Sequence, residues 1–237
     1  MPCRQLTCAI LPINPTYEVQ FDSIRFVAML LIGMFDSPFV RRVAVSLKLL
    51  GFAFEHGNWS VGKDHEQIRR YSPLGRVPTV VLEDGEVLTE SAAILDYLDS
   101  VAGPERALVP AHGAVRRQVL QLMALALGAG EKGRDLIYER IGRPPEKRHE
   151  PWEERLRSQM HGAFGEIERW QVRRPGRWLV GENLTQADVT LTCVWTCMRE
   201  ALALAEGPYP ALTALAGRCE ALPEFVATRI PWFAAKI

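Results

Sequence analysis

A serine and a proline at the start of a predicted helix are the first residues of this chain whose types suggest chemistry. An apolar run over residues 29–35 gives way to Asp36-Ser37-Pro38, the pattern of a strand followed by a helix. Ser37 is at the expected N-cap and Pro38 at the first helical position, and capping alone explains both. A helix N-terminus also favours an anion such as a thiolate, to which the hydroxyl of Ser37 can donate.

A proline directly ahead of a predicted strand is the second candidate, in Arg76-Val77-Pro78-Thr79. A trans bond at the first residue of a strand is the ordinary interpretation, because cis X–Pro bonds are a small minority in folded proteins. If the Val77–Pro78 bond is cis, the amide and carbonyl of Val77 are left to pair with an extended, peptide-like ligand. The sequence pattern by itself leaves both forms open.

Glu90 and Ser91 form the third candidate, between a predicted strand and an amphipathic helix with Ile94, Leu95 and Leu98 on its apolar face. Ser91 as a plain N-cap is a sufficient explanation for its presence. Because the Ser91 amide also lies at a helix start, the same position can hold a carboxylate. Taken alone, the pair is a weak signal.

The elements that must position these candidates form a small α/β domain over residues 29–103. Asp84-Gly85 is a strong hairpin signal between two short strands, and apolar residues recur at helical spacing after Ser37 and Ser91. The expected order is strand 29–35, helix 38–50, strand 52–59, helix 64–72, strands 79–82 and 86–88, and helix 91–103. Such a sheet buries its apolar residues under its helices.

The rest of the chain lacks an alternating apolar pattern and is typical of helices. A linker over residues 104–113 leads into an all-helical domain over residues 114–237. Its helices are expected at about 114–141, 151–171, 186–205, 209–220 and 223–230. Residues 1–28 fit neither domain and are expected to be an extension outside the core, because they contain prolines and no sustained periodicity.

Three motifs in this order resemble the thioredoxin-like first domain of glutathione S-transferases, in particular bacterial serine-type members related to the zeta and omega classes. They are Ser37-Pro-Phe-Val-Arg-Arg-Val43, Ser72-Pro-Leu-Gly-Arg-Val-Pro-Thr-Val80 and Leu88-Thr-Glu-Ser-Ala-Ala-Ile-Leu-Asp-Tyr-Leu98. In the helical domain, Thr185 and Asp188 resemble the family's capping box. The resemblance covers about residues 29–235 and implies the cytosolic glutathione transferase fold, a thioredoxin-like α/β domain (βαβαββα) followed by an all-α domain.

The resemblance implies a transferase that uses reduced glutathione as co-substrate and conjugates it to a small electrophilic molecule. It assigns the following residues to the glutathione site: Ser37, Phe39, Lys63, Val77, Pro78, Glu90 and Ser91. Ser37 would be the catalytic residue, whose hydroxyl stabilises the thiolate. Pro78 would be cis, and Val77 would pair with the cysteinyl backbone. Glu90 and Ser91 would hold the γ-glutamyl end, and Lys63 would reach the glycyl carboxylate.

The chain also departs from some members of that family. Phe35 and Asp36 stand at the end of the first strand, where a tyrosine-type enzyme has its thiol activator. Ser37 occupies the place of the cysteine in omega-like relatives, so mixed-disulfide chemistry has no nucleophile there. A carboxylate of Asp36 that pointed inward would disfavour a thiolate, because a nearby like charge raises its pKa. We therefore expect Asp36 to face outward.

Composition and cysteine spacing argue against several other classes. The chain has 28 basic and 28 acidic residues, so the bulk attraction of a general nucleic-acid binder is absent. Its apolar runs are far shorter than the roughly 20 residues of a membrane helix, and no secretory signal is evident, so we expect a cytoplasmic protein. The five cysteines have no zinc-like spacing, and we expect no metal. The resemblance implies a homodimer.

Two other functions fit the same motifs. Some proteins with this fold bind partners or ligands without catalysis, and zeta-type relatives are glutathione-dependent isomerases. The presence of Ser37, Val77, Pro78, Glu90 and Ser91 favours a working glutathione site over the first of these. Nothing in the helical domain identifies an isomerase substrate, so this alternative stays open.

Overall fold

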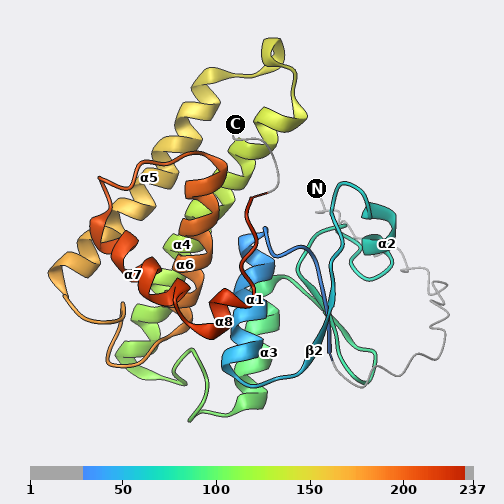
Figure 1. Ribbon diagram of the computed structural model, residues 1–237, viewed down its shortest axis with the longest axis vertical. Coiled ribbons are helices and arrows are strands. Elements are labelled where there is room, and N and C mark those ends of the chain that lie inside the picture. The colour runs from blue at the N-terminus through green and yellow to red at the C-terminus, as the bar shows by residue number, and fades with distance from the viewer. Residues whose placement is uncertain (1–28, 233–237) are drawn as a thin grey trace, which may run out of the picture.

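The computed structural model describes residues 29–232, which form a four-stranded sheet flanked by helices and, beside it, a group of packed helices (Figure 1). Residues 1–28, predicted to be an extension, and residues 233–237 lie outside the described part of the chain. The architecture confirms the predicted fold class. None of the helices within residues 29–232 is long and apolar enough to cross a membrane.

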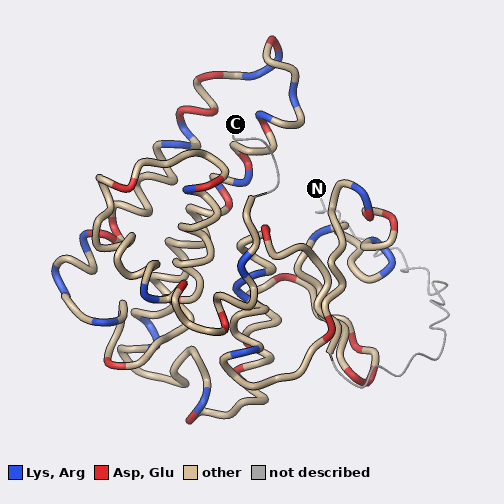
Figure 2. The backbone as a smooth tube through the Cα atoms, in the orientation of Figure 1, with Lys and Arg blue, Asp and Glu red and all other residues tan. Residues whose placement is uncertain are grey.

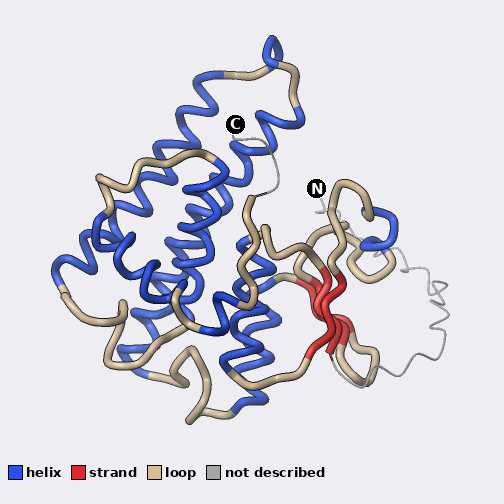
Figure 3. The backbone as a smooth tube through the Cα atoms, in the orientation of Figure 1, coloured by secondary structure: helices blue, strands red, loops and turns tan. Residues whose placement is uncertain are grey.

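The sheet is mixed and lies beside the helical part of the molecule (Figure 3). Its strands are β1 (Met29–Ile32), β2 (Phe54–Gly57), β3 (Thr79–Val81) and β4 (Val87–Thr89), in the order β2-β1-β3-β4. β1 pairs with β2 in parallel, whereas β3 is antiparallel to both β1 and β4. The register sets Ile32 opposite Thr79, and Thr79 opposite Thr89. The end of β1, the start of β3 and the end of β4 therefore meet at one edge of the sheet.

Helices make up the rest of the described chain. The helices that flank the sheet are α1 (Pro38–Leu49), α2 (His65–Arg69) and α3 (Ser91–Ala102). The helical part contains α4 (Gly113–Gly142), α5 (Glu150–Arg173), α6 (Gln186–Ala201), α7 (Pro210–Glu220) and α8 (Pro223–Val226), with a 3-10 turn at Pro145–Lys147. Residues 103–112 connect the two parts without a further helix or strand. Basic and acidic residues are interspersed along the chain (Figure 2).

β1 ends at Ile32 and not at Phe35 as predicted, and the backbone of Gly33 explains the early end. Gly33 has φ +128°, and a Cβ atom there would lie 2.6 Å from Cγ2 of Val40 and 2.8 Å from Cβ of Val77. A side chain at this position would collide with both neighbours, so glycine is required. Gly33 thus turns the chain from the sheet into the loop that carries Ser37.

Two predicted helices in the C-terminal part are shorter in the structure. α6 ends at Ala201 instead of residue 205, because Ala203 adopts φ 52° in the left-handed region, which a helix cannot contain. α8 ends at Val226 instead of residue 230. There the hydroxyl of Thr228 donates to the carbonyls of Glu224 and Phe225 at 3.2 Å each. These carbonyls at the end of the helix are thus bonded by a nearby side chain instead of by a further helical turn.

α1 lies between the sheet and the helical part and packs on both (Figure 1). Its sheet-facing side contributes Val40, Val43 and Leu47 to an apolar cluster with Leu31 and Val80, all fully buried. The α-helical spacing of these residues is what the sequence predicts for a helix that covers a sheet. This packing holds the N-terminal end of α1, where Ser37 is the N-cap, in place on the sheet.

The opposite side of α1 makes polar bonds with the helical part. Nη1 and Nη2 of Arg41 donate to the two carboxylate oxygens of Glu220 at 2.7 and 2.6 Å, and Nη2 also donates to the carbonyl of Phe225 at 3.0 Å. The hydroxyl of Ser46 donates to Oε1 of Gln186 at 2.9 Å. The bidentate Arg41–Glu220 bond, supported by the Ser46–Gln186 bond, fixes the relative orientation of the two parts.

The predicted capping box at the start of α6 is confirmed. Oδ2 of Asp188 accepts the backbone amide and the hydroxyl of Thr185, both at 2.8 Å. Oδ1 of Asp188 accepts the amide of Leu179, also at 2.8 Å. Asp188 is fully buried, so one carboxylate holds both the helix start and the loop before it.

Candidate active site

Ser37 is the N-cap of α1, as predicted. Its backbone is extended, with φ −70° and ψ 121°, and Pro38 is the first helical residue. Oγ of Ser37 accepts the amide of Val40 at 3.5 Å, a long distance for a hydrogen bond. Because this contact uses the hydroxyl as an acceptor, its proton can be donated to another group. Ser37 is partly buried, at the end of the helix where an anion is favoured.

The loop that carries Ser37 is held by a residue that the sequence did not single out. Nε2 of His56, in β2, donates to the carbonyl of Gly33 at 2.7 Å. The imidazole also stacks on the ring of Phe35, with centroids 3.8 Å apart and planes 3° from parallel. A histidine in a short strand has no sequence pattern that marks it for this task, since the contact depends on the parallel pairing of β1 and β2.

The segment before β3 lies against the same loop. The Val77–Pro78 peptide bond is cis, and Val77 lies close to Gly33. Within residues 29–232, neither the amide nor the carbonyl of Val77 makes a turn, loop or capping hydrogen bond. Both backbone groups are therefore able to pair with an extended ligand.

The structure corrects the prediction that Ser91 is an N-cap. α3 begins at Ser91 itself, and Glu90 occupies the N-cap position with φ 69° and ψ 126° and without a capping bond from its side chain. A non-glycine residue in such a conformation costs about 1–3 kcal/mol and is concentrated at functional sites. Ser91 is buried, and Glu90 forms an ion pair with Arg76 at 3.1 Å.

These contacts bring three of the predicted segments together at one edge of the sheet. Ser37 follows β1, Val77 and Pro78 precede β3, and Glu90 follows β4. The register of Ile32, Thr79 and Thr89 puts the three strand ends side by side. Arg76, which was not among the candidate site residues, links the second segment to the third through its ion pair with Glu90.

Phe39 and Lys63 have different surroundings from these segments. Phe39 faces α4, where the guanidinium of Arg134 lies 5.9 Å from the centre of its ring and Gly130 approaches it closely. Lys63 is exposed in the turn before α2. Their assignment to a glutathione site stays a prediction.

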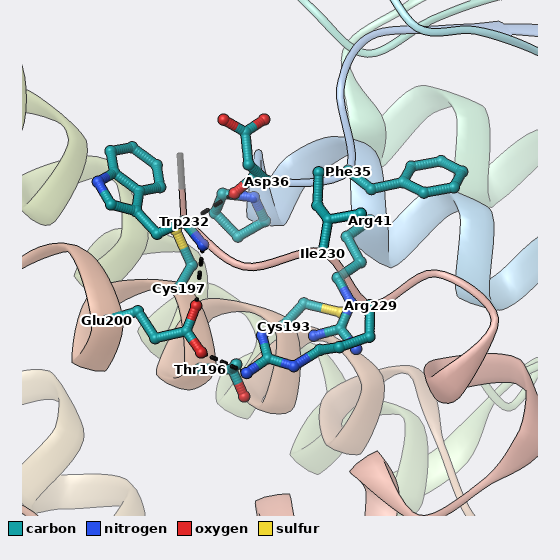
Figure 4. A pocket seen from close by; sticks show the side chains of 11 residues that line it. Phe35, Asp36, Arg41, Cys193, Thr196, Cys197, Glu200, Arg229, Ile230 and Trp232 are labelled. Carbon is teal, nitrogen blue, oxygen red and sulfur yellow. Dashed lines mark hydrogen bonds and ion pairs between the residues drawn. The ribbon is translucent and has the colours of Figure 1, made fainter. Parts of the chain in front are cut away.

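A small cavity opens beside Asp36 between α1, α6 and the chain after α8 (Figure 4). Its enclosed space is about 10 Å³, and the empty space reaches about 250 Å³ only when the open solvent at its mouth is included. Its lining combines rings and charged groups, among them Phe35, Asp36, Arg41, Glu200, Arg229 and Trp232. The residues from α6 and the C-terminal segment carry no sequence motif, so only the packing of the two parts reveals them.

Asp36 lines this cavity and is partly buried, but its carboxylate points away from Glu200 and from Cys197 (Figure 4), in the direction expected of a side chain that faces outward. Burial raises the pKa of the Asp36 carboxyl, although a bond from the Ser37 amide opposes the rise. The backbone carbonyl of Asp36 accepts the thiol of Cys197 at 3.5 Å. Burial raises the pKa of the Cys197 thiol far above its usual range, so this cysteine is a packing residue and a donor.

Within residues 29–232, no group of three or more His, Cys, Asp or Glu residues is arranged to hold a metal ion. The groups that the three segments bring to the edge of the sheet are the hydroxyl of Ser37, backbone amides and the carboxylate of Glu90, beside the N-terminus of α1.

Comparison with known proteins agrees with this geometry. Residues 31–106 match the family described as glutathione S-transferase, N-terminal domain, and residues 137–223 match glutathione S-transferase, C-terminal domain. The chain is 28% identical over 144 residues to the uncharacterised GST-like protein YibF of Escherichia coli, a match that covers 61% of this chain and 70% of that protein.

Solved structures of similar proteins extend the likeness to nearly the whole fold. A glutathione S-transferase from Methylobacterium radiotolerans, in complex with glutathione sulfonate, has a TM-score of 0.80 at 26% identity and covers 87% of this chain and 96% of its own. A glutathione transferase family member from Pseudomonas fluorescens, with bound glutathione, has a TM-score of 0.73 at 27% identity, with 86% and 100% covered.

The fold, a thioredoxin-like α/β part followed by a helical part, is that of the glutathione transferases. The chain belongs to the glutathione S-transferase family.

Proposed function

We propose that this protein is a glutathione transferase that binds reduced glutathione at the edge formed by β1, β3 and β4. The observation that carries the proposal is the meeting of Ser37, Val77 and Glu90 at that edge, which follows from the register of the sheet. The proteins of known structure that resemble it include one with bound glutathione. A small electrophilic molecule would be the second substrate.

The residues present fit the groups of a γ-glutamyl tripeptide. The unengaged amide and carbonyl of Val77 would pair with the cysteinyl backbone. The amide of Ser91, at the start of α3, would hold the γ-glutamyl carboxylate. The strained backbone of Glu90 supports a binding role for this turn, because such conformations are retained where function requires them. Lys63 would reach the glycyl carboxylate.

Ser37 would supply the thiolate stabilisation that the reaction needs. A free thiol titrates near 8.5, and lowering its pKa by about two units requires roughly 2.7 kcal/mol of preference for the thiolate. One hydrogen bond to a charged group contributes about 1.5–3 kcal/mol, and a helix N-terminus about 0.3–1 kcal/mol. Ser37 therefore acts as a donor and not as a base or nucleophile. Glutathione supplies the nucleophile of the reaction, its own thiolate.

The electrophile would approach the thiolate at the mouth of the cavity beside Asp36, because the enclosed space there is only about 10 Å³, room for about one water molecule. We propose a cytoplasmic homodimer as the working form, in line with the family resemblance, and light scattering of the purified protein measures the number of subunits.

Calorimetric titration with reduced glutathione, followed by conjugation assays with a panel of small electrophiles, tests the proposed function. We expect a single site per chain and enzyme-dependent loss of free thiol. Binding without conjugation of any electrophile would favour a non-catalytic glutathione-binding role instead. Absence of binding would remove the proposal altogether.

A further inference from the structure

We propose that His56 is a positioning residue, which sets the place from which the hydroxyl of Ser37 donates to the glutathione thiolate. The inference rests on the proposed function, because it explains how the proposed donor is held. His56 lies in β2, whereas Ser37 follows β1. His56 therefore acts through the loop between β1 and α1, and no contact with glutathione is assigned to it.

The hydrogen bond from His56 replaces a missing bond of the parallel strand pair. Gly33 continues the pairing of β1 by one residue, since its amide donates to the carbonyl of Gly57 at 2.9 Å. In a regular parallel pair the carbonyl of Gly33 would then accept the amide of Trp59. The chain turns after β2, and that amide donates to the carbonyl of Gly57 at 2.8 Å instead. Nε2 of His56 takes its place on the Gly33 carbonyl at 2.7 Å.

The imidazole of His56 holds the same loop at a second point, the ring of Phe35. The two ring centroids are 3.8 Å apart, and the planes are 3° from parallel. Between the two points, the carbonyl of Met34 accepts the amide of Ser37 at 3.2 Å. One side chain from β2 thus holds a backbone atom and a ring within residues 33–37, which separate β1 from α1.

A small displacement of this loop should weaken thiolate stabilisation more than glutathione binding. The hydrogen bond from a hydroxyl to the thiolate depends steeply on distance and angle, and a misplacement of about 1 Å can cost about a hundredfold in rate. The groups proposed to hold glutathione belong to other segments, Val77 before β3 and Ser91 at the start of α3. His56 is exposed, so its replacement opens no cavity in the core.

Two substitutions that each keep one contact of His56 test the inference. His56→Phe keeps a ring against Phe35 and loses the donor, whereas His56→Gln keeps a donor near the place of Nε2 and loses the ring. We expect His56→Phe to raise the pKa of the bound glutathione thiol by about half to one unit and to lower turnover at neutral pH about three- to tenfold. His56→Gln should restore most of both quantities. Glutathione affinity should stay within about twofold of the wild type in both variants.

A double-mutant cycle measures whether His56 acts through Ser37. In the Ser37→Ala background, His56→Phe should shift the thiol pKa by less than about 0.2 unit, because the donor that it positions is gone. Thiolate absorbance against pH measures the pKa, and calorimetry measures the affinity. His112→Phe is the matched control, because it replaces another exposed histidine, one whose side chain makes no capping bond at the start of α4. It should keep the wild-type thiol pKa.

Three results would overturn the inference while glutathione binding upholds the proposed site. They are an unchanged thiol pKa in His56→Phe, equal shifts in His56→Phe and His56→Gln, and shifts of His56→Phe and Ser37→Ala that add in the double variant. If the wild type binds no glutathione, the proposed function fails and the inference with it. Where His56→Phe does not fold, His56→Asn replaces it, because its shorter amide does not reach the Gly33 carbonyl.

Discussion

Ser37 occupies a backbone position that serves the fold and the proposed chemistry together. As the N-cap of α1 it accepts the amide of Val40, and as a hydroxyl it still has a proton to donate. Asp36, one residue earlier, is partly desolvated, and its carboxylate points away from Glu200 and from the thiol of Cys197 (Figure 4).

Ser37→Ala should raise the apparent pKa of enzyme-bound glutathione by about one to two units, the equivalent of one hydrogen bond to a charged group. Glutathione affinity should stay within about twofold of the wild type, because the backbone groups of Val77 and Ser91 are proposed to bind glutathione. The ultraviolet absorbance of the thiolate against pH measures the first quantity and calorimetry the second. Ser100→Ala, in the exposed part of α3, is the control. A titration curve of Ser37→Ala that overlays the wild type would reduce Ser37 to a helix cap.

Asp36→Asn should make the protein more stable at neutral pH. Burial raises the pKa of Asp36 in the folded state, so the folded protein binds its proton more tightly than the unfolded chain does. The free energy of unfolding therefore falls as pH rises from the usual aspartate pKa through the raised one. Urea unfolding of the wild type and Asp36→Asn should differ at neutral pH and coincide in acid. A difference that is equal at both pH values would contradict this origin.

At the scale of single elements, the capping box of α6 supports a helix that is almost entirely buried. Nearly every side chain of α6 lies in the core, so the helix cannot be stabilised by solvent at its start. The carboxylate of Asp188 satisfies the amides of Thr185 and Leu179 in that buried setting. The start of α6 and the loop before it are consequently both held by Asp188.

Asp188→Ala should lower the free energy of unfolding by about 2–4 kcal/mol, because two buried amides lose their acceptor. Burial also raises the pKa of the Asp188 carboxyl, which shows that the buried carboxylate carries a desolvation cost. Asp188→Ala removes this cost, so the loss of stability is smaller than the two lost bonds alone would give. Urea unfolding measures the change. Glu182→Ala, in the same loop but exposed, should stay within about 0.5 kcal/mol of the wild type. If Asp188→Ala and Glu182→Ala lowered the free energy of unfolding equally, the proposed role of the capping box would be ruled out.

At the scale of the whole molecule, α1 lies between the sheet and the helical part and carries two adjacent buried arginines that differ in their partners. Arg41 is paired with Glu220, and this bond keeps the pKa of Glu220 below its usual value although burial alone would raise it. Arg42 is completely buried, and its guanidinium nitrogens make no hydrogen bond within residues 29–232. Burial lowers the pKa of Arg42 to about 10.

The two arginines should therefore respond in opposite ways to replacement by methionine. Arg41→Met leaves Glu220 without its bidentate partner and should cost about 2–4 kcal/mol. Arg42→Met removes a buried, unpaired charge and should be neutral or stabilising. Denaturant unfolding of both variants measures the difference. Equal destabilisation would show that side-chain packing, and not ion pairing, dominates at this interface.

Much of the fold could be predicted from local patterns. The proline and serine at the start of α1, the Asp84-Gly85 turn and the capping box of α6 act within a few residues, and such short-range preferences are legible in a sequence. The ends of β1, α6 and α8 were misplaced, because they depend on contacts of Gly33, on the backbone of Ala203 and on the hydroxyl of Thr228.

By itself the sequence determined the order of the elements, the family resemblance and the candidates Ser37, Val77 and Glu90. Only the tertiary structure decided which of these candidates meet, because register across β1, β3 and β4 aligns strand ends that are far apart in the chain. It also decided that Asp36 is partly buried beside a cavity that Trp232 also lines. Burial and desolvation arise when distant segments pack together, so no local pattern of residues encodes them.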